Sequence, residues 1–180
     1  MNEESNCGLG REATEEYGVI IAASVAKKYA DAGRHVGMIA QGDDYYHFPA
    51  RQGDLNLWRI MEALAVCKAG GRIPFERILA GASHQMSGNS VAIIITASAR
   101  REIASSVLSL RKQGIQAVVV LLDPSTFGGS GSIKETEKRL RASNVPLYII
   151  NQGDNLSEAL NGQSSSAKSA ASSGVKTIAG

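Results

Sequence analysis

Three short apolar runs in the second half of the chain predict strands. They are residues 91–96, 117–122 and 146–150. Uninterrupted apolar runs of this length are typical of strands that are buried on both faces. A helical pattern follows each run, at residues 102–112, 133–143 and 156–160. This alternation predicts an α/β fold of three layers, in which a mostly parallel sheet lies between helices on both of its faces.

The first half of the chain predicts a hairpin. Residues 36–40 form a short apolar run that is typical of a buried strand, and residues 41–44 form a turn. Residues 45–50 alternate weakly between apolar and polar. Because proline has no N–H to donate, Pro49 places this second strand at the edge of a sheet.

Helical spacing predicts three more helices around this hairpin. The first begins near Thr14, which we expect to be its N-cap, and Gly33 can end it in the left-handed conformation. Its faces are apolar or small nearly all round, so we expect it to be covered on most sides. The second helix begins near Asp54 and carries Trp58, which we expect to anchor the core. Pro74 opens the third.

Length and composition indicate one domain with polar ends. The chain has 180 residues, which suits a single globular unit. We expect residues 1–13 to be a flexible N-terminus and residues 14–161 to form the domain. Residues 162–180 are rich in Ser, Ala and Gly, and they offer too little apolar surface to offset the entropy of ordering them. We therefore expect this tail to be disordered.

Charge and cysteine content exclude several classes of protein. The 19 basic residues nearly balance the 17 acidic ones, which does not indicate a nucleic-acid partner. No apolar run approaches the roughly 20 residues of a membrane span. The two cysteines, Cys7 and Cys67, form neither a disulfide framework nor a metal-ligand cluster. We expect a reduced, cytoplasmic setting, in which Cys67 is a buried and inert thiol.

Ligands of an open parallel sheet bind beyond the carboxyl ends of its strands, where four loops of this chain would lie. The most suggestive is the glycine-rich loop from Asp123 to Ser132, whose backbone N–H groups could cradle phosphate. This loop has neither the GxxxxGK[ST] nor the GxGxxG pattern, so we favour a solvated connection. Asp123 is expected to cap the turn at Ser125 or Thr126.

Two other groups could bind ions. Asp43 and Asp44 could supply oxygen ligands to a hard cation, although acidic residues that follow a glycine in a hairpin are more often turn formers. Ser98, Arg100 and Arg101 could hold an anion together with the neighbouring Thr96. We favour the alternative, in which Ser98 is a helix N-cap and the arginines are solvated. No catalytic constellation is found, so we expect no enzymatic activity and no cofactor.

Five segments, in their order and spacing, resemble a known bacterial family. They are residues 10–17, 32–37, 57–65, 71–74 and 121–129. From residue 10 to about residue 160 the chain resembles the C-terminal, von Willebrand factor A-like part of the domain-of-unknown-function 58 family. The resemblance implies a Rossmann-like sheet in the order three-two-one-four-five-six, with the third strand antiparallel at an edge.

The resemblance also implies that the family's first, central strand is missing from this chain. The second and fourth strands would then close the gap directly, or a partner would fill it, or the fold would be only marginally stable. An unfilled gap leaves backbone hydrogen-bonding groups unpaired, which is energetically costly. A homo-oligomer or a second chain could complete the sheet.

A metal site of the von Willebrand factor A type is not expected. In that site Mg²⁺ is bound by an Asp-x-Ser-x-Ser segment, a threonine and an aspartate. The first motif has no counterpart here, and the positions of the threonine and the aspartate are Ile73 and Ala97. These two side chains offer no oxygen to a hard cation.

The expected function is that of a non-enzymatic protein-interaction module. Its binding surface would consist of side chains in the carboxyl-end loops, namely Asp43, Asp44, Ser98, Arg100, Arg101, Asp123 and Ser125. The resemblance implies a MoxR-type AAA ATPase as partner, and through partners an association with the membrane. One alternative is a small α/β enzyme that binds a nucleotide or phosphate in the loop from Asp123 to Ser132. Another is a truncated gene product without an independent role.

Overall fold

The computed structural model describes residues 6–8, 10–71, 73–86 and 89–160. A short 3-10 helix (Gly10–Glu12) comes first, and the other elements are α1 (Thr14–Asp31), β1 (Val36–Gln41), β2 (Tyr45–Arg51), α2 (Asp54–Val66), α3 (Phe75–Ser83), β3 (Val91–Thr96), α4 (Glu102–Lys112), β4 (Gln116–Leu122), a second 3-10 helix (Pro124–Phe127), α5 (Lys134–Ala142), β5 (Leu147–Ile150) and α6 (Leu156–Leu160). The predicted strands are confirmed, with ends that differ by no more than one residue.

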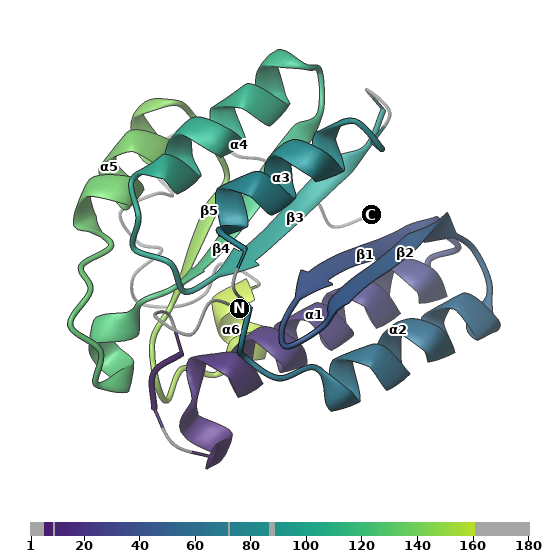
Figure 1. Ribbon diagram of the computed structural model, residues 1–180, viewed down its shortest axis with the longest axis horizontal. Coiled ribbons are helices and arrows are strands. Elements are labelled where there is room, and N and C mark those ends of the chain that lie inside the picture. Colours follow the sequence, from purple (N-terminus) through teal and green to yellow (C-terminus); the bar gives the residue numbers. More distant parts are fainter. Residues whose placement is uncertain (1–5, 9, 72, 87–88, 161–180) are drawn as a thin grey trace.

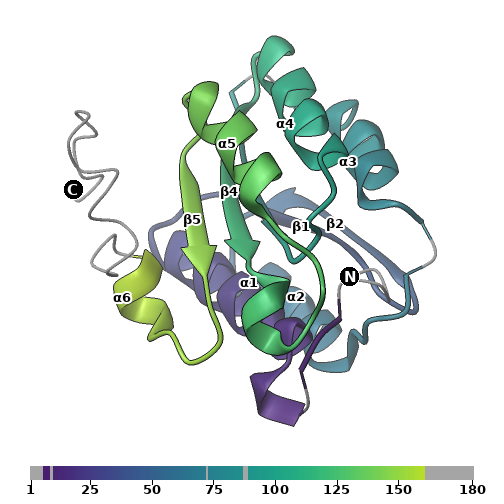
Figure 2. The same ribbon diagram turned by 90° about the vertical axis from the view of Figure 1, so that its left-hand side faces the viewer.

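The second half of the chain forms a parallel sheet in the order β3-β4-β5. Helices α3, α4 and α5 cover one face of this sheet, and α1 and α6 cover the other (Figures 1 and 2). Successive residues of β4 alternate between the two faces, as the strand geometry requires. Val119 and Leu121 pack into the cluster beneath α4, whereas Val120 and Leu122 pack into the cluster on the side of α1. The predicted arrangement of a parallel sheet between helices is therefore confirmed.

The first half of the chain forms the predicted antiparallel hairpin of β1 and β2. Its apolar side chains pack with α1 and α2 in a small cluster whose buried members are Ala26, Ile60 and Leu64. β1 was expected to be a buried strand, and this is wrong, because every residue of β1 is half-buried or exposed. An apolar run shows that a strand can be buried on both faces, but whether it is buried depends on its neighbours in space.

The hairpin and the parallel sheet are separate sheets. Among the described strands, β1 pairs only with β2, and β3 only with β4. The direct pairing of β1 with β3, which was one of the alternatives expected from the resemblance, is therefore not observed. α1 contacts both β1 and β3 and so links the two sheets (Figure 1).

Two expectations about helix packing are wrong. Trp58, expected to anchor the core, is 63% exposed on the outer side of α2, and Leu55 beside it is 67% exposed. α2 buries Ile60 and Leu64 instead. This helix has apolar residues on more than one face, so spacing alone could not determine which face meets the core. α1 is also less covered than expected, because its Ile20 is 46% exposed.

The start of α1 is fixed by contacts with the segment that precedes it. Thr14, expected to be the N-cap, is the first helical residue, and the N-cap is Ala13. The hydroxyl of Thr14 accepts a hydrogen bond from the N–H of Cys7 (3.0 Å), and the Thr14 N–H donates to the Cys7 carbonyl (2.8 Å). Of the two ends expected to be flexible or disordered, residues 1–5, 9 and 162–180 lie outside the described residues.

Within the described ranges, no helix combines the length and the apolar character needed to cross a membrane.

Gly42 tests the packing of the hairpin turn against the end of α2. A Cβ atom at this position would collide with the carbonyl oxygen of Lys68 and would lie 2.8 Å from the Cys67 sulfur. We expect Gly42→Ala to lower the free energy of unfolding by about 1–3 kcal/mol, as overpacking does. Gly81, within α3, is the control, because a Cβ there would meet nothing within 4 Å. Gly81→Ala should raise the free energy of unfolding by up to about 1 kcal/mol. Chemical denaturation measures both effects, and a neutral Gly42→Ala would contradict the close packing.

Candidate functional site

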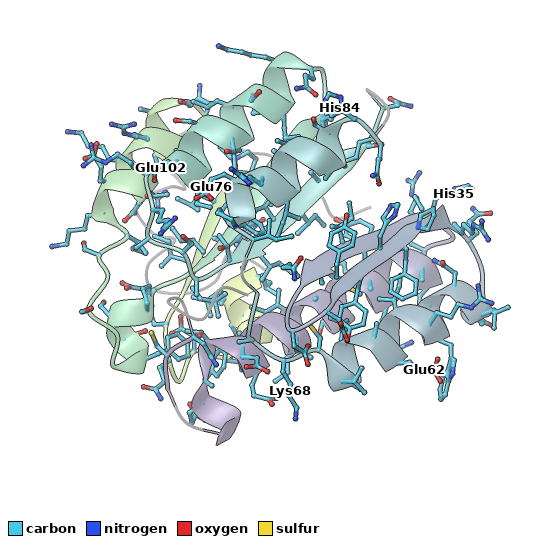
Figure 3. All side chains as sticks on the ribbon, in the orientation of Figure 1. His35, Glu62, Lys68, Glu76, His84 and Glu102 are labelled. Atoms are coloured by element: carbon cyan, nitrogen blue, oxygen red, sulfur yellow. The ribbon has the colours of Figure 1, made fainter. Side chains whose placement is uncertain are left out.

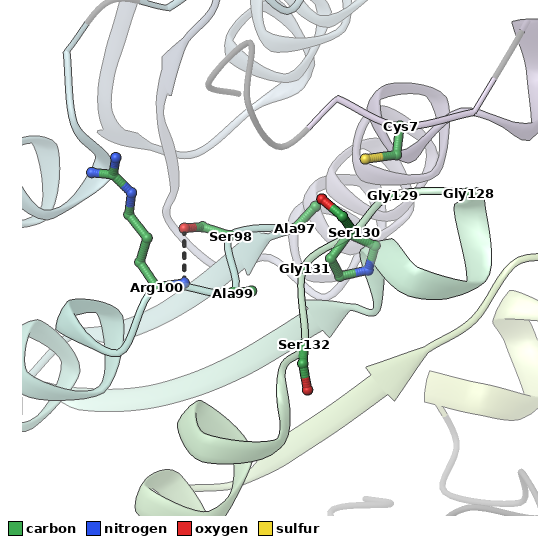
Figure 4. A pocket seen from close by; sticks show the side chains of 11 residues that line it. Cys7, Ala97, Ser98, Ala99, Arg100, Gly128, Gly129, Ser130, Gly131 and Ser132 are labelled. Carbon is green, nitrogen blue, oxygen red and sulfur yellow. Dashed lines mark hydrogen bonds between the residues drawn. The ribbon is translucent and has the colours of Figure 1, made fainter.

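A pocket of about 630 Å³ opens at the carboxyl ends of β3 and β4. One wall is the β3–α4 loop from Ala97 to Arg100, and the opposite wall is formed by Pro124 and residues 128–132 (Figure 4). Cys7 completes the lining from the N-terminal segment. The position agrees with the rule that open parallel sheets bind ligands beyond the carboxyl ends of their strands.

The Asp123 side chain shapes the second wall. Its Oδ1 accepts hydrogen bonds from the N–H of Ser125 (3.0 Å) and from the Ser125 hydroxyl (2.7 Å). The hydroxyl of Thr126 donates to the Asp123 carbonyl (2.8 Å). The predicted capping role of Asp123 is thus confirmed. Because Asp123 and Ser125 bind each other, their polar atoms act first to build the turn.

This turn is also anchored in the core. The second 3-10 helix buries Phe127, whose ring lies edge-on to that of Tyr17 in α1 with 5.0 Å between the ring centroids. The Tyr17 hydroxyl accepts a hydrogen bond from the N–H of Gly153 in the next loop (2.9 Å) and donates to Glu12 (3.2 Å). The carboxyl-end loops are therefore tied to the beginning of α1.

The glycines of this wall serve close packing. A Cβ atom on Gly129 would lie 2.5 Å from the Cys7 sulfur and 2.9 Å from the Pro124 carbonyl oxygen. The N–H of Gly129 donates to that same carbonyl (2.8 Å). A phosphate cradle needs backbone N–H groups that point toward the ligand. The Gly129 N–H is instead used within the loop.

The first wall is a hydroxyl-supported turn. Thr96 Oγ1 accepts a hydrogen bond from the N–H of Ser98 (3.1 Å), and Ser98 Oγ accepts one from the N–H of Arg100 (3.4 Å; Figure 4). Ser98 was expected to be the N-cap of the following helix, and this is wrong, because α4 begins at Glu102 and its N-cap is Arg101. Ser98 and Arg100 line the pocket, whereas Arg101 is exposed beyond it.

A residue that the sequence analysis missed ties this turn to α5. Thr136 is fully buried, and its hydroxyl contacts the carbonyl oxygens of Ala99 and Arg100 (both 3.2 Å). Thr136 lies one helical turn before the buried Leu140 in an otherwise charged helix. That spacing was the signal for a buried position, but nothing local to α5 indicated what the hydroxyl would bind.

Asp43 and Asp44 lie at a different place, in the turn of the hairpin. The N–H of Asp44 donates to Asp43 Oδ1 (3.1 Å), and the N–H of Gly42 donates to the Asp44 carbonyl (2.9 Å). These contacts are those of turn formers. Burial first, and then the two carboxylates, raise the pKa of the neighbouring Tyr46. No group of three or more His, Cys, Asp or Glu that could hold a metal ion occurs in the part of the chain that the structure describes.

Ala97 and Ile73, the two positions at which the resemblance would place metal ligands, do not share a pocket. Ala97 is buried in the pocket at the ends of β3 and β4, whereas Ile73 is 44% exposed and lines a second hollow with Gln41, Asp43 and Gly70. The structure thus brings Ser98 and Arg100 together in one pocket, with Asp123 and Ser125 in the adjoining turn. Asp43 lines the second hollow, and Asp44 follows it in the hairpin turn.

Comparisons with protein-family models, curated proteins and solved structures find no match to this chain. The chemistry of the pocket therefore follows from its lining. The polar side chains there are the Arg100 guanidinium, the Cys7 thiol and the hydroxyls of Ser98, Ser130 and Ser132. Among the described residues, this lining provides hydrogen bonds and one positive charge, and it contains no carboxylate or imidazole.

The two cysteines differ in their surroundings. Both are free and half-buried. Burial is the main cause that raises the pKa of the Cys67 thiol, and the nearby carboxylates of Asp43 and Glu15 raise it further. A thiol with a raised pKa carries less thiolate at neutral pH and is less reactive. Cys67 is thus less buried than expected, but its environment favours the inert thiol.

The raised pKa of Cys67 gives a measurable pH dependence. In a Cys7→Ser variant, which leaves Cys67 as the single thiol, we expect alkylation by iodoacetamide to reach half its maximal rate at a higher pH in the folded protein than in the urea-unfolded protein. The thiolate is the reacting form, so a higher pKa moves the whole profile to higher pH. The alkylation rates are measured by quenching the reaction at timed intervals and determining the alkylated fraction by mass spectrometry. If the folded protein reaches half its maximal alkylation rate at the same pH as the unfolded protein, or at a lower pH, the raised pKa of Cys67 is contradicted.

Proposed function

We propose that this chain is a non-enzymatic protein-interaction module. The observation that carries the proposal is the uneven distribution of exposed large apolar side chains. Seven of them lie in the first 73 residues: Ile20, Tyr29, Tyr45, Leu55, Trp58, Val66 and Ile73. Val91 is the one such residue described in the rest of the chain. Exposed apolar side chains that gather on one part of a domain are typical of surfaces that bind other proteins.

α2 is the best-defined part of this surface. Leu55 and Trp58 are three residues apart and therefore lie on the same side of the helix. Tryptophan is enriched among the residues that dominate binding energy at protein interfaces. Leaving these two side chains in water costs the free energy that burial would release, about 25 cal/mol per Å² of apolar surface. A partner that covers the outer side of α2 would recover that free energy.

The proposed partner is a MoxR-type AAA ATPase, acting in the cytoplasm. This choice rests on the resemblance of the sequence to the domain-of-unknown-function 58 family. The carboxyl-end side chains Ser98, Arg100 and Arg101, with Asp123 and Ser125, would form a second, polar contact surface. Asp43 and Asp44 would extend it along the hairpin turn.

The interaction is tested by titrating a purified MoxR-type AAA ATPase from the same organism into the chain and measuring Kd by biolayer interferometry. We expect Trp58→Ser to weaken binding at least tenfold, because hot-spot residues contribute most of the interface energy. Leu55→Ser should weaken it less. Since both side chains are mostly exposed, neither variant should change the unfolding midpoint.

Lys138→Ser is the control, because Lys138 is exposed on α5, which packs on the parallel sheet. It should leave Kd unchanged. An absence of binding by the wild-type chain would contradict the proposed partner. Binding that is insensitive to Trp58→Ser and Leu55→Ser would contradict the proposed surface.

The second candidate function is the binding of phosphate or a nucleotide in the pocket at the ends of β3 and β4. The observation in its favour is that Arg100 and the hydroxyls of Ser98, Ser130 and Ser132 line one hollow. A ligand present at 100 times its dissociation constant stabilises the folded state by about 2.7 kcal/mol. A rise of the unfolding temperature with ATP, with or without Mg²⁺, that is lost in Arg100→Ala would favour this candidate over the interaction module.

A further inference from the structure

We infer that the space between β1 and β3 is a binding site for one extended, apolar segment of another polypeptide, which pairs with both strands and joins the two sheets. We call this space the strand slot. The inference deepens the proposed function, since it rests on the chain being a protein-interaction module and names the chemistry of a segment that it binds. The slot is distinct from the outer side of α2 and from the pocket at the carboxyl ends of β3 and β4.

The edge of β3 that faces the slot has open backbone groups. The N–H of Gln116 in β4 donates to the carbonyl of Ser90 (3.1 Å). Backbone groups point to alternate sides along a strand, so Val91, Ile93 and Ile95 direct theirs away from β4. No other described strand pairs with that side. These N–H and C=O groups match a partner strand.

The edge of β1 that faces the slot has the same property. The N–H of Gly42 donates to the carbonyl of Asp44 across the hairpin (2.9 Å), and the register continues with Ala40 opposite Tyr46. By the same alternation, the backbone groups of Ile39 point away from β2. At the carboxyl end of β1 the slot is bounded by Gly71, where an added Cβ would lie 3.3 Å from the Gln41 carbonyl oxygen.

Helices lie on both faces of the slot. α1 contacts β1 and β3 on one face. On the other face α3 contacts β1, and its Leu79 packs in the same core cluster as Ala92 and Ile94 of β3. Figure 3 shows α1 and α3 on opposite sides of the space between hairpin and sheet. A strand in the slot would therefore be covered on both faces, as an interior strand of a parallel sheet is.

Several side chains next to the slot are less buried than side chains of an interior strand in a parallel sheet. In β3, Ala92, Ile94 and Thr96 are buried, whereas Ile93 and Ile95 are half-buried and Val91 is 54% exposed. The last three side chains lie on the face of α1. Ile39 is also half-buried. β3 has the apolar sequence of a central strand, but its side chains on this face are exposed like those of an edge strand. This difference indicates that a neighbouring strand would cover them.

The chemistry of the occupant follows from this lining. β1 and β3 run in the same direction (Figure 1) and each has six residues, so the slot fits about six residues in extended conformation, parallel to both. Apolar side chains surround it, so the segment must be apolar on both faces and without proline. A second copy of this chain is a poor occupant, because all five of its described strands already pair with another strand.

The test uses a fluorescein-labelled peptide, Lys-Lys-Val-Ile-Val-Val-Leu-Val-Lys-Lys, and the full chain. We expect saturable binding by fluorescence anisotropy with one peptide per protomer. The matched control is the same peptide with N-methyl groups on alternate apolar residues, which cannot pair along one edge. It should bind at least tenfold more weakly. Equal affinity for the two peptides would overturn the inference.

Hydrogen exchange locates the bound peptide. We expect the amide protons of Val91, Ile93, Ile95 and Ile39 to exchange at least tenfold more slowly in the complex. β5 also has an open outer edge, which serves as the internal comparison because it offers only one strand to pair with. Protection confined to β5, or protection of β3 without Ile39 of β1, would overturn the inference.

A protein variant tests the same contact from the other side. Val91 is the first residue of β3, and its N–H faces the slot, so Val91→Pro removes one open donor and no bond to β4. It should weaken peptide binding at least fivefold, whereas Val91→Thr, which retains the N–H, should not. If Val91→Pro does not fold, the N-methylated peptide and the exchange data still decide.

Three results separate this inference from its alternatives. Peptide binding that occurs only after removal of residues 161–180 would assign the slot to the chain's own tail, and a stable dimer that excludes the peptide would assign it to a second copy. Either result overturns the inference. The wild-type chain could also fail to bind the peptide and yet bind the ATPase in a way that depends on Trp58. That result would contradict the proposed strand slot and would leave the proposed function unaffected.

Discussion

The packing of one helix against two sheets holds this molecule together. The N-terminal half of α1 places Tyr17 and Ile21 in the core cluster under the parallel sheet, and its C-terminal half places Ala26 in the cluster with Ile60 under the hairpin. No described strand pairing crosses from one sheet to the other. The two sheets are therefore held together by apolar contacts along the 18 residues of α1, whereas in a continuous sheet neighbouring strands are held together by backbone hydrogen bonds.

The functional features follow from that arrangement. At the carboxyl ends of β3 and β4 most polar groups are already satisfied, because Asp123 binds Ser125, Ser98 binds the backbone of its own turn, and the Gly129 N–H is used within its loop. Backbone groups without a partner strand lie instead at the edges of the described sheets, and exposed apolar side chains lie elsewhere on the surface. Such groups can bind polypeptide chains, by backbone pairing and by burial of apolar surface.

The sequence predicted what depends on neighbours along the chain. Strand and helix positions, the hairpin, and the capping bond of Asp123 were all determined within a few residues, and the structure confirms them. Two wrong predictions, the burial of β1 and the role of Trp58, concerned contacts between distant segments. The approach of Cys7 to Gly129 and the contact of Thr136 with Ala99 were missed for the same reason, since neither has a local pattern. The N-caps expected at Thr14 and Ser98 were wrong by one and three residues, because each hydroxyl binds a backbone group other than the helix end.

A link made by one helix also determines how the molecule comes apart. Each half has its own small core, and the core under the hairpin has far fewer large buried side chains than the cores on the two faces of the parallel sheet. Regions with little buried apolar surface open at lower free energy than the rest of a protein. The hairpin with α2 is thus the first unit to open while the parallel sheet stays intact, and α1 is the element through which the two halves unfold cooperatively or separately.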